Sequence, residues 1–263
     1  MELGLTGRRA IVTGGSKGLG KAITAELLAE GAAVTTCSRH AGELQDTVAD
    51  LSKDAASGQQ LLGLPCDVTD PAQVSDFIAA AAAAMGGIDI LVNNAGGARP
   101  GRFAALTDED WHDDIEVKLF SQIRCIRAAL PHLRASAAPR VININALYAR
   151  YPDPAFLASS VNRASCLSLS KALSIELGVE GILVNSVNIG FVATPQWQNI
   201  HARRAPEMPA EEFFGQLVKA EVPLGRFGEP AEVAGLVAFL ASDRASYIAG
   251  ASIDVGGGMG KFL

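Results

Sequence analysis

Short apolar segments alternate with longer segments of helical periodicity along most of the chain, and this alternation constrains the fold more than any other feature. The segments with strand character are 9–15, 32–38, 61–70, 88–96, 140–146, 181–190 and 250–257. Helices are predicted between them, at 18–32, 43–52, 71–87, about 108–133, 155–173 and 229–242. Such strict alternation is typical of a parallel sheet covered by helices on both faces.

The predicted fold class is therefore α/β, a Rossmann-like doubly wound parallel sheet of about seven strands. No repeat or linker divides the 263 residues, so residues 1–263 are predicted to form a single domain. In open sheets of this kind, ligands bind beyond the carboxyl ends of the strands, where the strand order reverses.

Composition narrows the class of partner. The net charge of −6 argues against a nucleic-acid or membrane-surface binder, since both need basic patches. Neither the four cysteines nor the four histidines form a metal-ligand pattern, and we expect no metal site. No apolar run reaches the roughly 18 residues that a membrane helix needs, and the first residues do not resemble a signal peptide. We expect a cytoplasmic protein.

A glycine-rich turn, TGGSKGLG, follows the first predicted strand and opens the first predicted helix. Gly14, Gly18 and Gly20 stand in the spacing G-x-x-x-G-x-G, which lets the backbone approach a pyrophosphate at a helix N-terminus. Tight turns without a ligand also use such glycines. The position between a strand and a helix favours the nucleotide-binding interpretation.

Four further motifs occur in order along the chain: CDVTD at 66–70, NNAG at 93–96, ILVNSVNIG at 182–190 and YIAGASIDVGG at 247–257. Together with the glycine-rich turn, they resemble the short-chain dehydrogenase/reductase family from about residue 5 to residue 258. The resemblance implies a nicotinamide cofactor, a small-molecule substrate and a homo-oligomer, a tetramer or dimer. The cofactor-binding residues that it implies are Gly14, Ser16, Lys17, Gly18, Leu19, Gly20, Ser38, Arg39, Asp67, Val68, Asn93, Ala95, Gly96, Arg163, Gly190, Val192 and Thr194.

The end of the second predicted strand indicates which nicotinamide cofactor is preferred. NAD-binding relatives place a carboxylate there for the ribose 2′-hydroxyl, whereas this chain has Ser38 followed by Arg39, with Lys17 in the glycine-rich turn. Two cations without a carboxylate suit a 2′-phosphate, so NADP(H) is predicted in preference to NAD(H). The alternative is that both cations are solvated surface charges.

The family's Y-x-x-x-K motif does not occur. The residues four positions after Tyr148, Tyr151 and Tyr247 are proline and alanines. Aligning SLSKALSIEL with the later part of the family's active-site helix places Ser159 in the tyrosine slot and Arg163 in the lysine slot. In the same alignment, Ala146 takes the place of a serine and Lys118 that of an asparagine.

These replacements leave the proton donor open. Arg163 can contact the nicotinamide ribose but stays protonated, so it is a poor relay. Ser159 is a weak acid without an activating partner. Lys118, if buried, loses its proton readily, and Tyr148 borders the expected substrate cleft. A surface or structural lysine and a tyrosine used for loop packing are the alternatives for these two.

Three functions fit these residues. The first is an NADP(H)-dependent oxidoreductase acting on a carbonyl or alcohol substrate with a non-standard proton donor. The second is a nucleotide-binding protein without redox activity, regulatory or scaffolding, and the third is an isomerase or lyase on the same fold. Residues 194–226 are expected to form a mobile substrate lid in which Trp197, Phe213 and Phe214 are candidate apolar contacts or simply packing residues.

Overall fold

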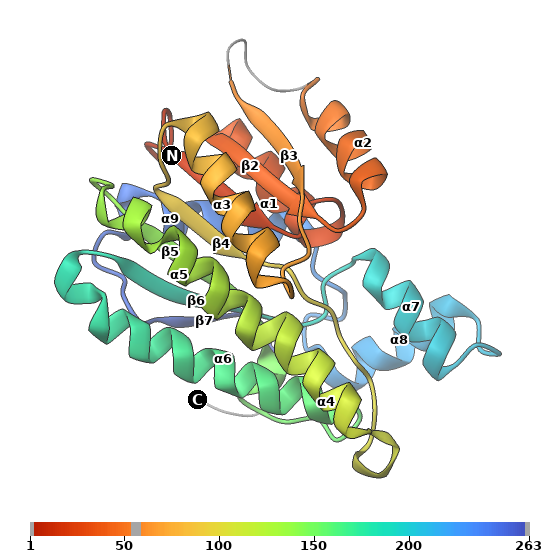
Figure 1. The fold of residues 1–263 in the computed structure, drawn as a ribbon. Coiled ribbons are helices and arrows are strands. Elements are labelled where there is room, and N and C mark those ends of the chain that lie inside the picture. The colour runs from red at the N-terminus through yellow and green to blue at the C-terminus, as the bar shows by residue number, and fades with distance from the viewer. Residues whose placement is uncertain (1–2, 54–58, 261–263) are drawn as a thin grey trace.

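Parallel strands form the centre of the computed structural model, which describes residues 3–53 and 59–260 (Figure 1). Within those ranges, seven strands make one sheet in the order β3-β2-β1-β4-β5-β6-β7, with every pairing parallel. The strands are β1 (Arg9–Thr13), β2 (Ala33–Ser38), β3 (Leu61–Pro65), β4 (Ile90–Asn93), β5 (Arg140–Ala146), β6 (Leu183–Ile189) and β7 (Ser252–Val255). The predicted fold class is confirmed.

Helices cover both faces of the sheet (Figure 1). They are α1 (Gly18–Ala29), α2 (Ala41–Leu51), α3 (Pro71–Met85), α4 (Asp108–Ile115), α5 (Ser121–Arg134), α6 (Leu157–Glu176), α7 (Pro195–Arg204), α8 (Ala210–Glu221) and α9 (Pro230–Ala241). Shorter helical turns are Phe103–Ala105, Leu147–Ala149, Gly178–Glu180 and Asp243–Ala245. Helices α1 and α9 pack together over one apolar core, and α3 and α5 pack over the other. None of the described helices is long and apolar enough to cross a membrane.

The predicted long helix at 108–133 is present but changes its winding in the middle. Between α4 and α5, residues Glu116–Phe120 form a π-helical turn, which widens the helix by one residue per turn. Such turns redirect the side chains they carry. Here the turn carries Lys118, which is only 1% exposed.

The segment 194–226 contains no strand, as predicted, but it folds into the two helices α7 and α8. Pro195 occupies the first turn of α7, where a missing N–H costs nothing. Trp197 and Phe213 are buried in an apolar cluster of their own, together with Phe191 and Phe156. These two aromatics therefore hold the segment against the turns that follow β5 and β6, in agreement with the packing alternative.

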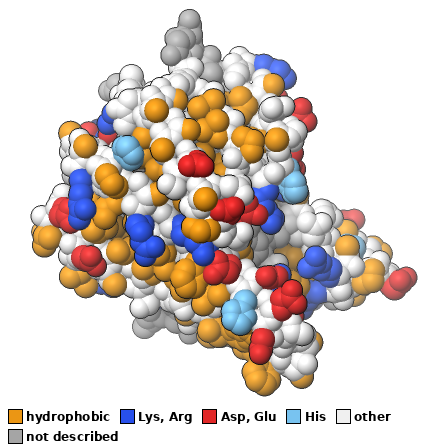
Figure 2. Space-filling view, in the orientation of Figure 1, with side chains coloured by type: hydrophobic (Ala, Val, Ile, Leu, Met, Phe, Trp, Pro, Cys, Tyr) orange, Lys and Arg blue, Asp and Glu red, His pale blue; other side chains and the backbone are white. Residues whose placement is uncertain are grey.

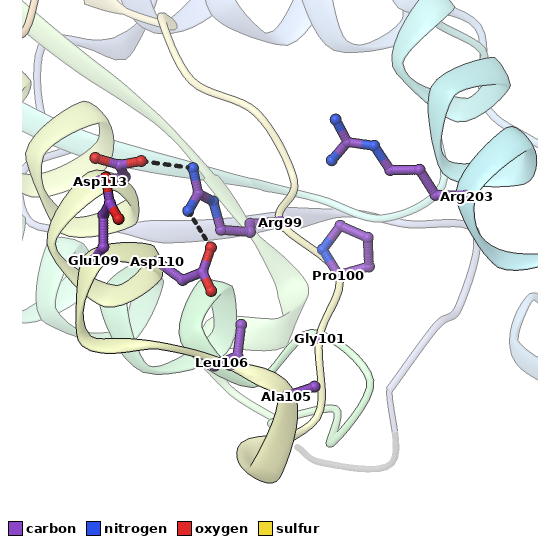
Figure 3. Close-up of a pocket in the computed structure, with 9 residues that line it drawn as sticks. All are labelled: Arg99, Pro100, Gly101, Ala105, Leu106, Glu109, Asp110, Asp113 and Arg203. Atoms are coloured by element: carbon purple, nitrogen blue, oxygen red, sulfur yellow. Dashed lines mark hydrogen bonds and ion pairs between the residues drawn. The ribbon is translucent and has the colours of Figure 1, made fainter.

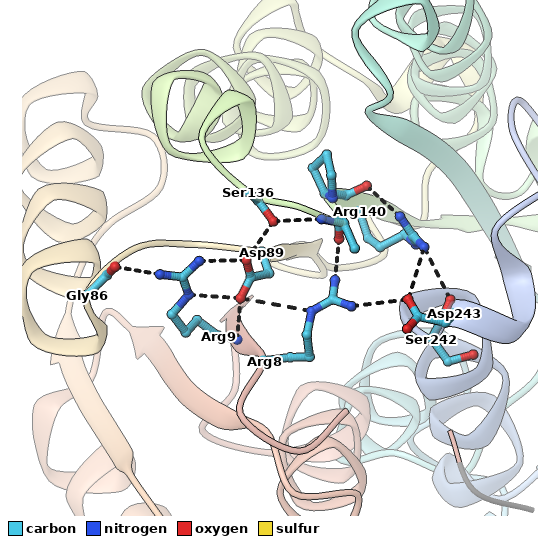
Figure 4. Close-up of polar contacts among 10 residues, drawn as sticks. Arg8, Arg9, Gly86, Asp89, Ser136, Arg140, Ser242 and Asp243 are labelled. Carbon is cyan, nitrogen blue, oxygen red and sulfur yellow. Dashed lines mark hydrogen bonds and ion pairs between the residues drawn. The ribbon is translucent and has the colours of Figure 1, made fainter. Parts of the chain in front are cut away.

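A polar cluster closes the opposite end of the sheet, where the strands begin (Figure 4). Asp89 accepts hydrogen bonds from Arg9 Nε and Nη2 at 2.8 and 2.7 Å and from Ser136 Oγ at 2.6 Å. Burial alone would raise the pKa of Asp89, but these hydrogen bonds outweigh it and the pKa is lowered. Asp89 thus stays ionised inside the protein and ties β1 to the start of β5.

Figure 2 shows one face of the molecule, on which acidic and basic side chains are interspersed among apolar ones. Among the described residues, no three His, Cys, Asp or Glu side chains gather in a way that would hold a metal ion.

Candidate active site

The strand order reverses between β1 and β4, and the loops that leave these strands lie against each other. Gly14 has φ +71°, and a Cβ on it would lie 2.9 Å from Ala95 Cα. A Cβ on Gly20 would lie 2.1 Å from the carbonyl oxygen of Gly14. Any side chain at these two positions would close the space between the loops, which explains the glycine spacing.

The N-terminus of α1 faces this space with its backbone donors available. Its first residue is Gly18, and the N-cap residue Lys17 makes no side-chain capping hydrogen bond. The first N–H groups of a helix lack partners within the helix and favour an anion such as a pyrophosphate. The residues therefore fit the phosphates of a dinucleotide.

Asn94 joins the two loops, a role that the sequence motifs did not indicate. Its Nδ2 donates to the carbonyl oxygens of Thr13 and Gly14 at 2.9 and 3.0 Å, while the N–H groups of Asn94 and Ala95 donate to Thr13 Oγ1. The side chain of Asn93, in contrast, is buried in the sheet and donates to Asn143 Oδ1 at 2.8 Å.

The predicted adenine end of the site lies beyond β2 and β3. Asp67 Oδ1 accepts hydrogen bonds from the N–H and hydroxyl of Thr69, which shapes the turn after β3, and Val68 is buried. Ser38 is the last residue of β2 and Arg39 is exposed beside it. On the other side of this edge, Ser16 and Lys17 both contact Glu43 of α2.

A buried chain of polar side chains connects the π-helical turn with α6. Lys118 Nζ donates to Ser159 Oγ at 2.7 Å and to Asp114 Oδ1, and the other carboxylate oxygen of Asp114 accepts from Asn162 Nδ2 at 2.9 Å. Ser159 Oγ also accepts a hydrogen bond of 3.2 Å from the backbone N–H of Arg99. Two of the predicted catalytic residues, Lys118 and Ser159, are therefore in direct contact.

The surroundings of Lys118 lower its pKa to about 8. Burial is the main cause, because it disfavours the ammonium form, and repulsion from Arg163 adds to it. Asp114 opposes both effects. Lys118 can consequently gain or lose a proton close to neutral pH, which an ordinary lysine does not do. The alternative of a surface lysine is excluded by its burial.

Arg163 lies one helical turn beyond Ser159 on α6 and is buried between β5 and the loop after β4. Its Nη1 donates to the carbonyl oxygen of Ile144 at 2.7 Å, and a Cβ on Gly96 would lie 2.9 Å from its Nη2. Burial lowers the pKa of Arg163, yet a guanidinium remains protonated at physiological pH. The side chain thus brings a fixed positive charge to the predicted nicotinamide end of the cleft.

Tyr148 lies apart from these groups in the short turn after β5. Its ring stacks on Phe156 at a centroid distance of 5.4 Å and meets Tyr151 edge-on at the same distance. Burial raises the pKa of the Tyr148 hydroxyl well above its usual value, and Asp153 raises it further. A hydroxyl with a raised pKa is a weaker acid, so this environment favours the packing role.

The remaining predicted cofactor residues follow β6. Gly190 lies close to Leu147 and Gly256, and a Cβ on Gly190 would lie 2.8 Å from Gly256 Cα. Val192 is buried, and Thr194 is the N-cap residue of α7, so the segment 194–226 begins beside these residues.

A polar pocket of about 450 Å³ opens between the loop after β4, the start of α4 and the end of α7 (Figure 3). Arg99 extends into it and pairs with Asp110 at 2.6 Å and Asp113 at 3.0 Å. Arg203, near the end of α7, also lines the pocket. Gln196 of α7 accepts a hydrogen bond of 3.1 Å from the N–H of Ala98, which connects the lid to the same loop.

Sequence reasoning missed Asp114, Asn162 and Glu43. Of these three, Asp114 is the one that the sequence could have indicated. It precedes Lys118 by four residues, and side chains at this spacing meet on a helix. Asn162 and Glu43 act across packed elements and leave no local signal.

Comparison with known proteins is consistent with this geometry. A family model described as enoyl-(acyl carrier protein) reductase matches residues 14–260. The putative ketoacyl reductase of a monensin polyketide synthase from Streptomyces virginiae is 37% identical over 260 residues, covering 98% of each chain. A 3-oxoacyl-[acyl-carrier-protein] reductase from Salmonella typhimurium is 35% identical over 96% of this chain and 97% of its own.

Two solved structures are also similar. L-sorbose reductase from Gluconobacter frateurii, in complex with NADPH and L-sorbose, has a TM-score of 0.95 and 29% identity, with all of both chains covered. An NADPH-bound short-chain oxidoreductase from Pseudomonas aeruginosa, described as containing an atypical catalytic center, has a TM-score of 0.89 and 38% identity, with 97% of each chain covered.

Proposed function

Because the chain belongs to the short-chain dehydrogenase/reductase family, we propose that it is an NADP(H)-dependent oxidoreductase that interconverts a carbonyl and an alcohol with Ser159 and Lys118 in place of the usual acid. The observation that carries this proposal is the 2.7 Å contact between Lys118 Nζ and Ser159 Oγ. It supplies Ser159 with the activating partner that a serine needs.

The cofactor assignment rests on the two loops at the strand-order reversal. When bound, the reduced nicotinamide supplies a hydride equivalent to the carbonyl carbon. The glycine-rich turn and the N-terminus of α1 would hold the pyrophosphate, and Arg163 would hold the nicotinamide ribose. Lys17 and Arg39, with Ser38 in place of a carboxylate, support NADP(H) over NAD(H).

The proton path follows from the hydrogen bonds at Ser159. Its oxygen accepts from Lys118 Nζ and from the N–H of Arg99, so its own hydrogen is left to be donated into the cleft. As the substrate carbon is reduced, the substrate oxygen takes that hydrogen. Ser159 recovers a proton from the Lys118 ammonium group, and Lys118 recovers one from water. In the oxidative direction each transfer is reversed.

Two buried groups adjust this path from opposite sides. The carboxylate of Asp114, held in place by Asn162, favours the ammonium form of Lys118. The guanidinium of Arg163 favours the neutral form. Together with burial, which is the largest cause of the lowered pKa, they leave Lys118 able to act as both donor and acceptor around pH 8.

The substrate is a small molecule with a carbonyl or alcohol group. The names of similar proteins indicate a first panel of 3-oxoacyl thioesters and L-sorbose. We further propose a cytoplasmic homo-oligomer, by analogy with the family.

The test is a single-turnover experiment in which the protein is mixed with NADPH and each member of the panel. NADPH oxidation is followed at its nicotinamide absorbance, and NADPH binding is measured separately by fluorescence. We expect oxidation by at least one substrate, and its loss in Ser159→Ala and Lys118→Met with binding retained. If NADPH binds but no carbonyl compound oxidises it, the function is the non-redox alternative. If neither nicotinamide cofactor binds, the proposal fails altogether.

A further inference from the structure

The carboxylate of Glu43 contacts Ser16 and Lys17, two hydrogen-bond donors that a 2′-phosphate would also use. Ser16 Oγ donates to Glu43 Oε2 at 3.0 Å, and Lys17 Nζ lies 2.9 Å from Glu43 Oε1. Both donors belong to the glycine-rich turn, whereas Glu43 lies in the first turn of α2, directly after the end of β2. The carboxylate thus joins the two segments between which the adenosine end of a dinucleotide would lie.

We infer that Glu43 is an internal competitor of the 2′-phosphate, so that it weakens the binding of 2′-phosphorylated adenosine ligands while leaving unphosphorylated ones unaffected. This inference rests on the cofactor assignment in the proposed function. It adds a specificity-determining residue that lies outside the glycine-rich turn and the end of β2.

The chemistry of the contact supports competition. A phosphate monoester carries close to two negative charges at neutral pH and accepts hydrogen bonds from the same kinds of donor as a carboxylate. To reach Lys17, it must displace Glu43 and then lie beside it as a like charge. A ribose 2′-hydroxyl carries no charge and needs no such displacement.

The ion pair between Lys17 and Glu43 is also weak enough for a ligand to displace it. The side chains of Lys17 and Glu43 are 57% and 37% exposed, and ion pairs this exposed are weak. The hydrogen bond from Lys17 lowers the pKa of Glu43, which keeps the carboxylate ionised at neutral pH. The backbone of the glycine-rich turn is fixed to α2 independently of this ion pair, because Thr47 Oγ1 donates a hydrogen bond of 2.6 Å to the carbonyl oxygen of Ser16.

The test compares two fragments, 2′,5′-ADP and 5′-AMP, by titration calorimetry on the full chain and on Glu43→Gln. We expect Glu43→Gln to bind 2′,5′-ADP roughly three- to tenfold more tightly, while the affinity for 5′-AMP changes by less than about twofold. Asp46→Asn is the matched control, since it removes the same charge from the same helix at an exposed position. It should leave both affinities unchanged.

A second variant shows whether the effect passes through Lys17. In a Lys17→Met background, Glu43→Gln should tighten 2′,5′-ADP binding by a smaller factor, because the Lys17 donor is gone and only the like charge and the contact with Ser16 remain to be removed. The inference is overturned if Glu43→Gln weakens 2′,5′-ADP, if it changes both fragments alike, or if Asp46→Asn reproduces its effect. These results leave the proposed function standing as long as the wild type binds NADPH. Failure of the wild type to bind either NADPH or NADH would overturn both, and failure to bind 2′,5′-ADP alone would overturn the inference.

Discussion

Lys118 Nζ lies 2.7 Å from Ser159 Oγ, and both atoms are buried where the π-helical turn meets α6. Neither residue has the pKa of a good acid in water. In the proposed mechanism, the lysine with its lowered pKa would supply and withdraw the proton, and the serine would donate it to the substrate.

Replacing Lys118 with methionine should reduce the rate of NADPH oxidation at saturating substrate by about 10²–10⁴-fold, because the proton source is removed. Lys118→Arg should be nearly as slow, since a guanidinium keeps its proton. Rapid mixing measures the rate, and fluorescence titration should show unchanged NADPH binding. Lys171→Met, on the exposed side of α6, is the control. A normal rate in Lys118→Met would exclude the lysine from the reaction.

The rate of reduction should depend on pH through Lys118. Its pKa is lowered to about 8, so the ammonium form and the rate decline as the pH rises above this value. Asp114→Asn removes the carboxylate that raises this pKa, and the decline should then begin about one pH unit lower or more. Asp113→Asn, one residue away and exposed, should keep the wild-type profile. A profile of kcat against pH distinguishes the two variants, and an unshifted Asp114→Asn profile would contradict the relay.

Tyr148→Phe should leave the rate within a few-fold of the wild type, although the sequence marks this residue as a candidate donor. Its ring keeps the same stacking on Phe156, and the raised pKa of its hydroxyl makes it a poor acid. The measurement is the same single-turnover rate. A loss as large as that of Lys118→Met would instead identify Tyr148 as the donor.

Asp89→Asn should destabilise the fold by about 3 kcal/mol, because the buried carboxylate is the counter-charge of the half-buried Arg9 (Figure 4). The pKa of Asp89 in the folded protein is below the ordinary 3.8, so its contribution is complete above that value and is lost as the pH falls through the folded-state pKa. Denaturant unfolding at pH 7 measures the difference. Asp243→Asn, whose side chain is 69% exposed, should cost less than about 1 kcal/mol.

The sequence predicts the sheet and the close approach of the two loops beyond it well, because their signals are local. The apolar runs at β1, β4 and β5 and the glycine spacing each depend on a few neighbouring residues. The sequence does not predict helices α7 and α8, because the prolines at 195, 206 and 209 argue against helix, although the first of these is a normal helix start.

The active centre was predicted only in part. Lys118 and Ser159 were named separately, but 41 residues separate them and their contact depends on how α6 packs against the π-helical turn. Helical spacing arithmetic assumes a regular winding, so it cannot show where such a turn directs a side chain. Glu43 was missed for the same kind of reason, since its partners lie 26 and 27 residues away.

The hydrogen bonds of Asn94 also affect the entropy and the heat-capacity change of ligand binding. They tie the end of β4 to loop residues 80 and 81 positions earlier in the chain, so both walls of the cleft are ordered when the protein folds. A ligand that enters a cleft already ordered bears no entropy cost for arranging it, and its heat-capacity change reflects only the surface it covers. In a variant without this amide, part of the folding of the cleft would be transferred to the binding step.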